Sequence, residues 1–129
     1  MLNYEFVSSR IQLPPYVSLR KLQERPTTFV VNLTKESILD ERNIELLTAY
    51  LLGASAKMIV YDLISLPLRK ASETAATILK ITQDYTDLEI RFSGLPMNKI
   101  KKRSDIVSLW EKELTKKGYR TLDEAVSSE

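Results

Sequence analysis

The chain contains no cysteine and no histidine among its 129 residues. The absence of cysteine excludes disulfides, thiolate nucleophiles and thiolate zinc ligands. The absence of histidine removes the commonest general base and every imidazole metal ligand. An enzyme made from this chain would have to use carboxylates, amines, guanidinium groups and hydroxyls. These absences favour a non-enzymatic protein with no cofactor and no bound metal.

Glycine is also scarce, with three residues in the whole chain. A loop that surrounds phosphate groups needs glycine, because backbone N–H groups must approach the anion closely. The segment ISLPLRKASET, residues 64–74, contains no glycine. Nucleotide binding through this segment is therefore not expected.

Long apolar runs are missing as well. No run approaches the ~18 residues of a membrane-spanning helix, and the N-terminal sequence MLNYEFVSSR lacks the apolar centre of a signal peptide. These features predict a cytoplasmic protein with no membrane partner. With 43% hydrophobic and 28% charged residues, the composition is that of one small globular domain. The net charge of +2 neither requires nor excludes a polyanionic partner.

The hydrophobic pattern predicts strands that alternate with helices. Because this order is typical of parallel strands joined by right-handed crossovers, we expect one α/β domain over 1–129. Its sheet is predicted to be mixed but mostly parallel, with four to five strands and with helices packed on it. The core is expected over 27–126, and residues 1–26 form either strands of the sheet, paired antiparallel, or an arm. Strands are predicted over 3–9, 16–22 (favoured over a short helix), 27–33, 57–66 and 87–96. Helices are predicted within 34–55, where Gly53 marks the end, over 69–85 and 104–118, and from Thr121.

The ends of these elements carry recognisable signals. Asp40 or Ser37 is predicted to cap the first helix, and residues 23–26 read as a turn that ends in a proline. Thr121 and Glu124 have the spacing of a capping box, which indicates a short last helix.

The buried strand predicted within 57–66 ends at Asp62. A phosphoacceptor aspartate of a receiver domain has a similar position, but it needs further acids on the preceding strand to hold Mg²⁺. That strand ends in Asn32, Leu33 and Thr34. The favoured interpretation is therefore that the carboxylate of Asp62 caps the following loop. The alternative is a small hydrolase, which predicts a pocket beside Asp62 with a second acid or a basic residue within reach.

Ser72 and Thr74 are predicted at the start of a helix, where a hydroxyl normally serves as a cap. The alternative is regulatory phosphorylation, for which Ser72 is the candidate. Phosphate there would meet the positive end of the helix dipole and the charges of Arg69 and Lys70.

The densest charge run is KIKKR, residues 99–103, within a basic linker over 97–103. A solvated linker is the default interpretation, because no aromatic residues are interleaved for base stacking. The alternative is a nucleic-acid-binding accessory protein whose basic side chains contact phosphates. Its candidate contacts are Lys99, Lys101, Lys102 and Arg103.

Between residues 27 and 126 the order of elements resembles a STAS domain, the fold of anti-sigma-factor antagonists and of sulfate-transporter tails. The similarity rests on TTFVVNL, ERNIELLTAYLL, MIVYDLISL, SETAATILK, LEIRFSGLP and GYRTLDEAV in this order. In that family a strand ends in Asp-Leu before the signalling loop, as Asp62-Leu63 do here. The last strand often closes near Gly-Leu, as Gly94-Leu95 do, and the chain often ends in a helix like the one from Thr121 to Ala125.

The resemblance implies a non-enzymatic regulator that binds a kinase-like protein or another STAS subunit. The family's phosphorylated pattern, Asp-Ser-Ser-Gly, is replaced here by Lys70-Ala71-Ser72-Glu73. The implied function is therefore partner binding through the loop 66–71 and the helix 72–83, without the usual phosphoserine switch. Pairing of an exposed sheet edge in a homodimer is a further expectation. The expected partner-facing residues are Arg69, Lys70, Ser72, Glu73 and Thr74.

Overall fold

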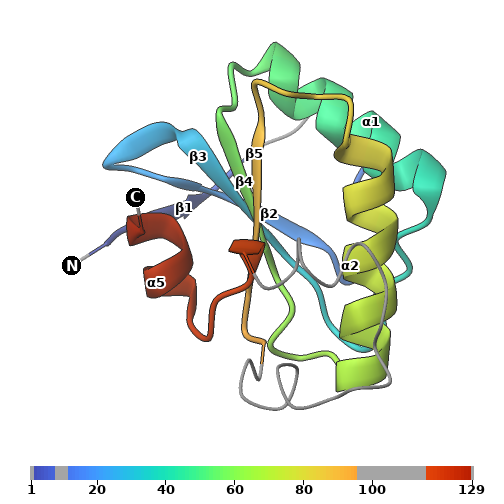
Figure 1. The fold of residues 1–129 in the computed structure, drawn as a ribbon. Helices are drawn as coiled ribbons and strands as arrows, with labels where there is room; N and C mark the ends of the chain where they lie inside the picture. Colours follow the sequence, from blue (N-terminus) through green and yellow to red (C-terminus); the bar gives the residue numbers. More distant parts are fainter. Residues whose placement is uncertain (1, 8–11, 96–115, 129) are drawn as a thin grey trace.

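A computed structural model describes residues 2–7, 12–95 and 116–128 of the chain. These residues form a small α/β domain with one five-stranded sheet and three helices (Figure 1). None of the helices in the described ranges has the length and apolar character needed to cross a membrane. The elements in chain order are β1 (Tyr4–Phe6), β2 (Ser18–Leu22), β3 (Arg25–Asn32), α1 (Glu41–Gly53), β4 (Met58–Asp62), α2 (Leu68–Thr82), β5 (Glu89–Ser93) and α5 (Leu122–Ser127).

The strands lie in the sheet in the order β1-β2-β3-β4-β5. The pairs β3–β4 and β4–β5 are parallel, whereas β1–β2 and β2–β3 are antiparallel. The prediction of a mixed sheet is confirmed, and of the two alternatives for residues 1–26 the structure shows antiparallel strands of the sheet. The prediction of a mostly parallel sheet is wrong, because half of the strand pairs are antiparallel. A turn of two residues joins β2 to β3, and such a short connection can join only antiparallel neighbours.

The start of β3 also differs from the prediction. The turn between β2 and β3 consists of residues 23–24, so β3 begins at Arg25 and includes Pro26. Proline disfavours a central strand because it cannot donate a ladder hydrogen bond. Here the register against β2 shifts, with Lys21 opposite Phe29 and Leu22 opposite Arg25. Pro26 lies within this irregularity, where no regular ladder bond is required of it.

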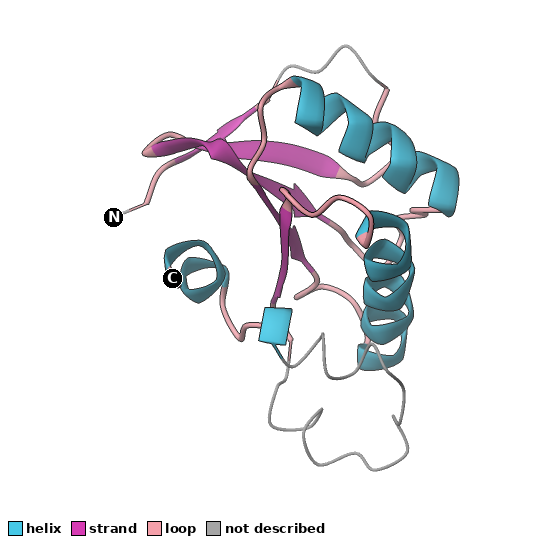
Figure 2. Cartoon of the chain, turned by 45° about the horizontal axis from the view of Figure 1, so that its top comes forward, coloured by secondary structure: helices cyan, strands magenta, loops and turns pink. Residues whose placement is uncertain are grey.

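The helices cover both faces of the sheet. Figure 2 shows α1 and α2 on one face and α5 on the other, with the strands between them. The larger apolar core lies under α1 and α2 and includes Phe29, Ile59, Tyr61 and Phe92, all nearly or fully buried. A smaller cluster lies under α5. It consists of the buried residues Leu22, Val30, Val60, Ala125 and Val126.

The two predicted N-caps with hydrogen-bonding side chains are present. The carboxylate Oδ1 of Asp40 accepts from the backbone N of Asn43 at 2.8 Å, so Asp40 caps α1. The other candidate, Ser37, instead donates its hydroxyl to the backbone O of Tyr16 at 2.7 Å. Thr121 caps α5, because its Oγ1 accepts from the backbone N of Glu124 at 3.2 Å.

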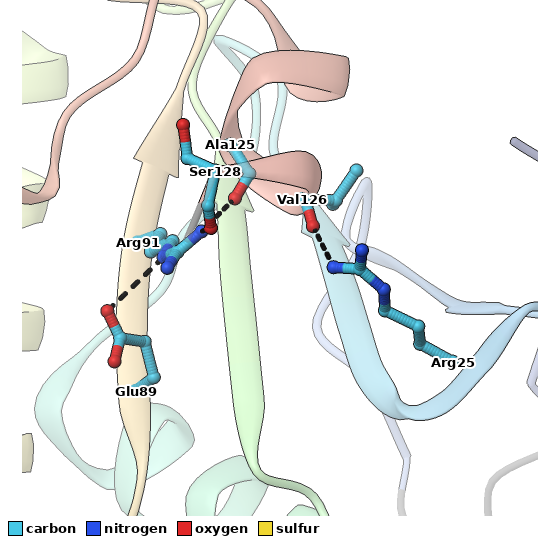
Figure 3. A network of polar contacts seen from close by, with 6 residues as sticks. All are labelled: Arg25, Glu89, Arg91, Ala125, Val126 and Ser128. Carbon is cyan, nitrogen blue, oxygen red and sulfur yellow. Dashed lines mark hydrogen bonds and ion pairs between the residues drawn. The ribbon is translucent and has the colours of Figure 1, made fainter.

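Two arginines hold the C-terminal end of α5 against the sheet (Figure 3). Nη1 of Arg91 donates to the backbone O of Ala125 at 2.7 Å and of Ser128 at 2.5 Å. Nη1 of Arg25 donates to the backbone O of Val126 at 2.6 Å. The last carbonyls of a helix have no partner within the helix, and the negative end of its dipole favours cations there. These arginines therefore satisfy the end of α5 and fix its position.

Part of the sequence prediction falls outside the described residues. This applies to the basic linker over 97–103 and to the predicted helix over 104–118 up to residue 115. After residue 115, Gly118 forms an isolated parallel bridge with Phe92 of β5. The backbone N of Tyr119 donates to the backbone O of Phe92 at 2.7 Å, so the chain returns to the edge of β5 before α5 begins.

Candidate functional site

The parallel strands β3, β4 and β5 all end at one edge of the sheet, from which the β3–α1 and β4–α2 loops emerge. Ligands and partners of open α/β sheets commonly bind at this edge, because loops from neighbouring strands meet there. In register, Asn32 pairs with Asp62 and Asp62 pairs with Ser93. Three polar side chains therefore lie side by side at the ends of the three strands.

The carboxylate of Asp62 is used within the fold. Its Oδ1 accepts from the backbone N of Ile64 at 3.3 Å and from Oγ of Ser93 at 3.2 Å. Its Oδ2 accepts from Nδ2 of Asn32 at 3.4 Å. Asp62 is 8% exposed. The prediction that it caps the following loop is confirmed by the bond to Ile64.

A groove of about 290 Å³ lies beside this edge, between the β3–α1 loop and the first turns of α2. Leucine side chains line part of it, and charged and hydroxyl side chains line the rest. We call it the loop groove. Its lining residues are Leu33, Ser37, Ile38, Leu39, Asp40, Leu66, Lys70, Glu73, Thr74 and Thr77.

Lys70 connects the two walls of the loop groove. Its Nζ donates to the backbone O of Lys35 at 2.6 Å and of Ser37 at 3.2 Å. Ser37 in turn bonds to the loop that precedes β2, through the backbone O of Tyr16. The β3–α1 loop is therefore held in place by contacts with α2 on one side and with the 12–17 loop on the other.

Of the five residues predicted to face a partner, three line the loop groove. These are Lys70, Glu73 and Thr74. Arg69 is exposed, and its Nε lies 3.3 Å from Oε1 of Glu73, one helical turn away. Ser72 is half-buried on α2 and does not line the loop groove.

The expectation that Ser72 and Thr74 cap a helix is wrong. α2 begins at Leu68, and its N-cap is Pro67, which makes no side-chain cap bond. The backbone N of Ala71 donates to the backbone O of Pro67 at 2.8 Å, so Ser72 and Thr74 lie inside the helix. The helix dipole acts mainly on the first turn, which weakens the electrostatic argument for phosphate at Ser72. The sequence signal for the true start of α2 was Pro67, because the fixed φ of proline suits a helix start.

The sequence predicted no function for three exposed apolar side chains on loops, of which Ile38 lines the loop groove. Tyr16, Ile38 and Ile64 are 65%, 74% and 65% exposed. Tyr16 has a φ of 64°, a conformation that is rare for a bulky residue and concentrates at functional sites. Gly94 has a φ of 75°, and a Cβ there would lie 2.5 Å from the backbone N of Ile64. Gly94 therefore lets the end of β5 pass closely against the β4–α2 loop.

The other predicted site has no structural description. The candidate nucleic-acid contacts Lys99, Lys101, Lys102 and Arg103 lie outside the described residues. Within the described ranges no group of three or more acidic side chains has the arrangement of a metal site. Comparison of the chain with protein-family models, with curated proteins and with solved structures found no match.

Proposed function

We propose that this chain is a regulatory protein–protein interaction domain that binds a protein partner through the loop groove. The observation that supports this most directly is the meeting of predicted partner-facing residues with apolar loop residues. Lys70, Glu73 and Thr74 line the same groove as Ile38 and Leu66. Protein interfaces combine an apolar centre with a polar rim in this way.

The size of the loop groove also favours a protein partner. At about 290 Å³ it is at the lower limit of small-molecule pockets. A groove of this size accommodates one or two side chains that project from a partner surface. Ile38 is 74% exposed beside it and would supply apolar contact at the rim.

The STAS resemblance supports the same assignment. The strand–loop–helix unit on which it rests is formed by β4, the loop 63–67 and α2. By this resemblance the partner is a kinase-like regulator or another STAS subunit. Because the Asp-Ser-Ser-Gly pattern is absent and Ser72 lies inside α2, we propose constitutive binding without a phosphoserine switch.

The test is affinity capture of partners from the source cells, followed by binding measurements with the purified partner. The informative variant is Ile38→Glu, because it places a charge at the loop groove without removing a buried contact. The matched control is Phe6→Glu on β1, where the phenylalanine is 78% exposed. We expect wild type and Phe6→Glu to bind the partner equally and Ile38→Glu to lose at least about tenfold in affinity.

Two results would contradict the proposal. One is equal binding of the same partner by wild type and both variants, which would place the interface elsewhere. The other is capture of nucleic acid with affinity that falls steeply as salt rises, since phosphate contacts release counterions. That second result would favour the nucleic-acid alternative.

A further inference from the structure

A second groove, which we call the β5 groove, lies between α2 and β5, beside the last strand of the sheet. Its volume is about 730 Å³. Leu79 of α2 contributes an apolar side chain to its lining, as do Leu88 and Ile90 in and just before β5. Ala76 lines it as well, one helical turn before Leu79 and Lys80. The groove therefore runs along one side of α2, and part of its surface is apolar.

The chain leaves and rejoins the described part of the fold at β5. The backbone N of Leu95, just after β5, donates to the backbone O of Tyr119 at 3.2 Å. The backbone N of Tyr119 donates in turn to the backbone O of Phe92 at 2.7 Å. Lys117, two positions earlier, lines the β5 groove. Residues 96–115, which lie outside the described ranges, are therefore attached at both ends beside β5.

The handedness of this connection fixes the face of the sheet over which it passes. The bridge between Phe92 and Gly118 is parallel, and it lies on the free side of β5, because β4 occupies the other side. Crossovers between parallel strands are right-handed in nearly all proteins. α1 and α2 are the crossovers of the pairs β3–β4 and β4–β5, and both lie on one face (Figure 2). A right-handed connection that continues in the same direction must pass over that same face, beside α2.

The sequence of the connection suits this position. It is longer than the dozen or so residues that a parallel crossover needs. A helix is predicted over 104–118, in which apolar residues recur at helical spacing and form one face. These residues are Ile106, Val107, Trp110 and Leu114. A helix with such a face needs an apolar surface to cover.

We propose that the β5 groove is occupied by segment 104–115 of this same chain, packed as a helix with Trp110 and its apolar neighbours against α2. The receiving side chains are Ala76 and Leu79, which are half-buried. A separate partner is a less favourable occupant, because the connection that follows β5 must itself cross this surface. The side of α2 at the β5 groove is then closed by the chain itself. A protein partner reaches α2 only from the side of the loop groove.

A fluorescent label tests this placement directly, because the chain has a single tryptophan, Trp110, and no cysteine. Bimane attached to an introduced thiol is quenched by a tryptophan only when the two are close. The label is placed at the β5 groove with Lys80→Cys or, as a control, on α1 with Ala49→Cys, both exposed positions. We expect the added change Trp110→Phe to raise the emission severalfold at position 80 and to leave it unchanged at position 49.

Two results of this experiment would overturn the proposal. One is an emission at position 80 that does not respond to Trp110→Phe, which would leave the β5 groove open to a partner or a ligand. The other is an equal response at positions 80 and 49, which would place Trp110 away from the β5 groove.

A charge introduced into the groove provides the second arm. Ala76→Glu places a carboxylate among the lining residues, and Ala49→Glu makes the same change on the exposed side of α1. We expect Trp110 emission to shift to longer wavelength, and its quenching by acrylamide to rise severalfold, in Ala76→Glu alone. Circular dichroism will verify that both variants remain folded. Emission that is unchanged in a folded Ala76→Glu variant, or as accessible in wild type as in the urea-unfolded chain, would overturn the proposal.

Discussion

The two faces of the sheet are covered by helices in different ways. On one face, α1 and α2 pack on the larger core, whose side chains are apolar and almost fully buried. On the other face, α5 is six residues long and buries Ala125 and Val126 against a small cluster. Its end is held by hydrogen bonds from Arg25 and Arg91 (Figure 3). Apolar area stabilises the first face, whereas charged hydrogen bonds contribute much of the attachment on the second.

The largest expected effect is a cavity under α1. Leu47 is 2% exposed and belongs to the larger core. Leu47→Ala is expected to lower the free energy of unfolding by about 3 kcal/mol, from lost apolar burial and the remaining cavity. Urea denaturation followed by circular dichroism measures this loss. If Leu47→Ala lowered the free energy of unfolding by less than Arg91→Met does, the comparison of the two faces would be contradicted.

The next largest effect is expected from Arg91→Met, which removes the guanidinium that contacts the end of α5. The side chain of Arg91 is 8% exposed, so its hydrogen bonds form away from water. The expected cost is about 2 kcal/mol, because hydrogen bonds to charged groups contribute more than neutral ones. Amide hydrogen exchange is expected to become faster in α5 and to stay unchanged in α1. Arg25→Met, which removes a single bond, serves as the milder control. Equal acceleration in both helices would show that α5 is not a separately held element.

A smaller effect is expected from Lys70→Met at the loop groove. The variant removes two bonds from Nζ to the β3–α1 loop while keeping the apolar stem. We expect a loss of about 1 kcal/mol in unfolding free energy, since these bonds lie partly in water. Hydrogen exchange within residues 34–40 should accelerate while β4 stays protected. Unchanged hydrogen exchange within residues 34–40 would mean that the contact with Tyr16, and not Lys70, holds the β3–α1 loop.

The smallest effect concerns alkaline pH, because each face holds one tyrosine with a raised pKa. Burial, together with the nearby charge of Asp123, raises the pKa of Tyr4 from 10.0 to about 12. Burial also raises the pKa of Tyr61. The unfolded chain releases these protons first, so the contribution of the two tyrosines to stability is constant below pH 10 and is lost as pH rises above it.

Urea midpoints above and below pH 10 measure this dependence. Tyr4→Phe and Tyr61→Phe should each reduce the decline of stability above pH 10. The reduction should be larger for Tyr61→Phe, because the side chain of Tyr61 is fully buried whereas that of Tyr4 is half-buried. Identical pH profiles for wild type and both variants would contradict these pKa directions.

The sequence predicted the central elements well because their signals are local. β3 and β4 are rich in β-branched and apolar residues, which is typical of strands buried on both faces. The caps Asp40 and Thr121 are also local signals. The early start of β3 was missed because proline is tolerated only where the ladder is irregular, and that irregularity depends on the register with β2.

The remaining features depend on distant pairs of residues. Arg91 bonds to Ala125 across 34 positions and Arg25 to Val126 across 101. Lys70 reaches the β3–α1 loop across 33 and 35 positions, a role that its helix position alone does not indicate. Three of the residues predicted to face a partner, Lys70, Glu73 and Thr74, line the loop groove. The contribution of Ile38 required knowing which loops meet at the sheet edge.

The central proposal, that the loop groove binds a protein partner, is tested most directly by site-specific photo-cross-linking in the source cells. The cross-linking residue replaces Glu73 at the loop groove or Lys57 at the opposite edge of the sheet, both exposed positions. Mass spectrometry identifies the products. The account predicts one protein joined through position 73, absent at position 57 and lost when Ile38→Glu is added. Cross-links to the same protein from both positions, or none from position 73 while the partner still binds, would contradict it.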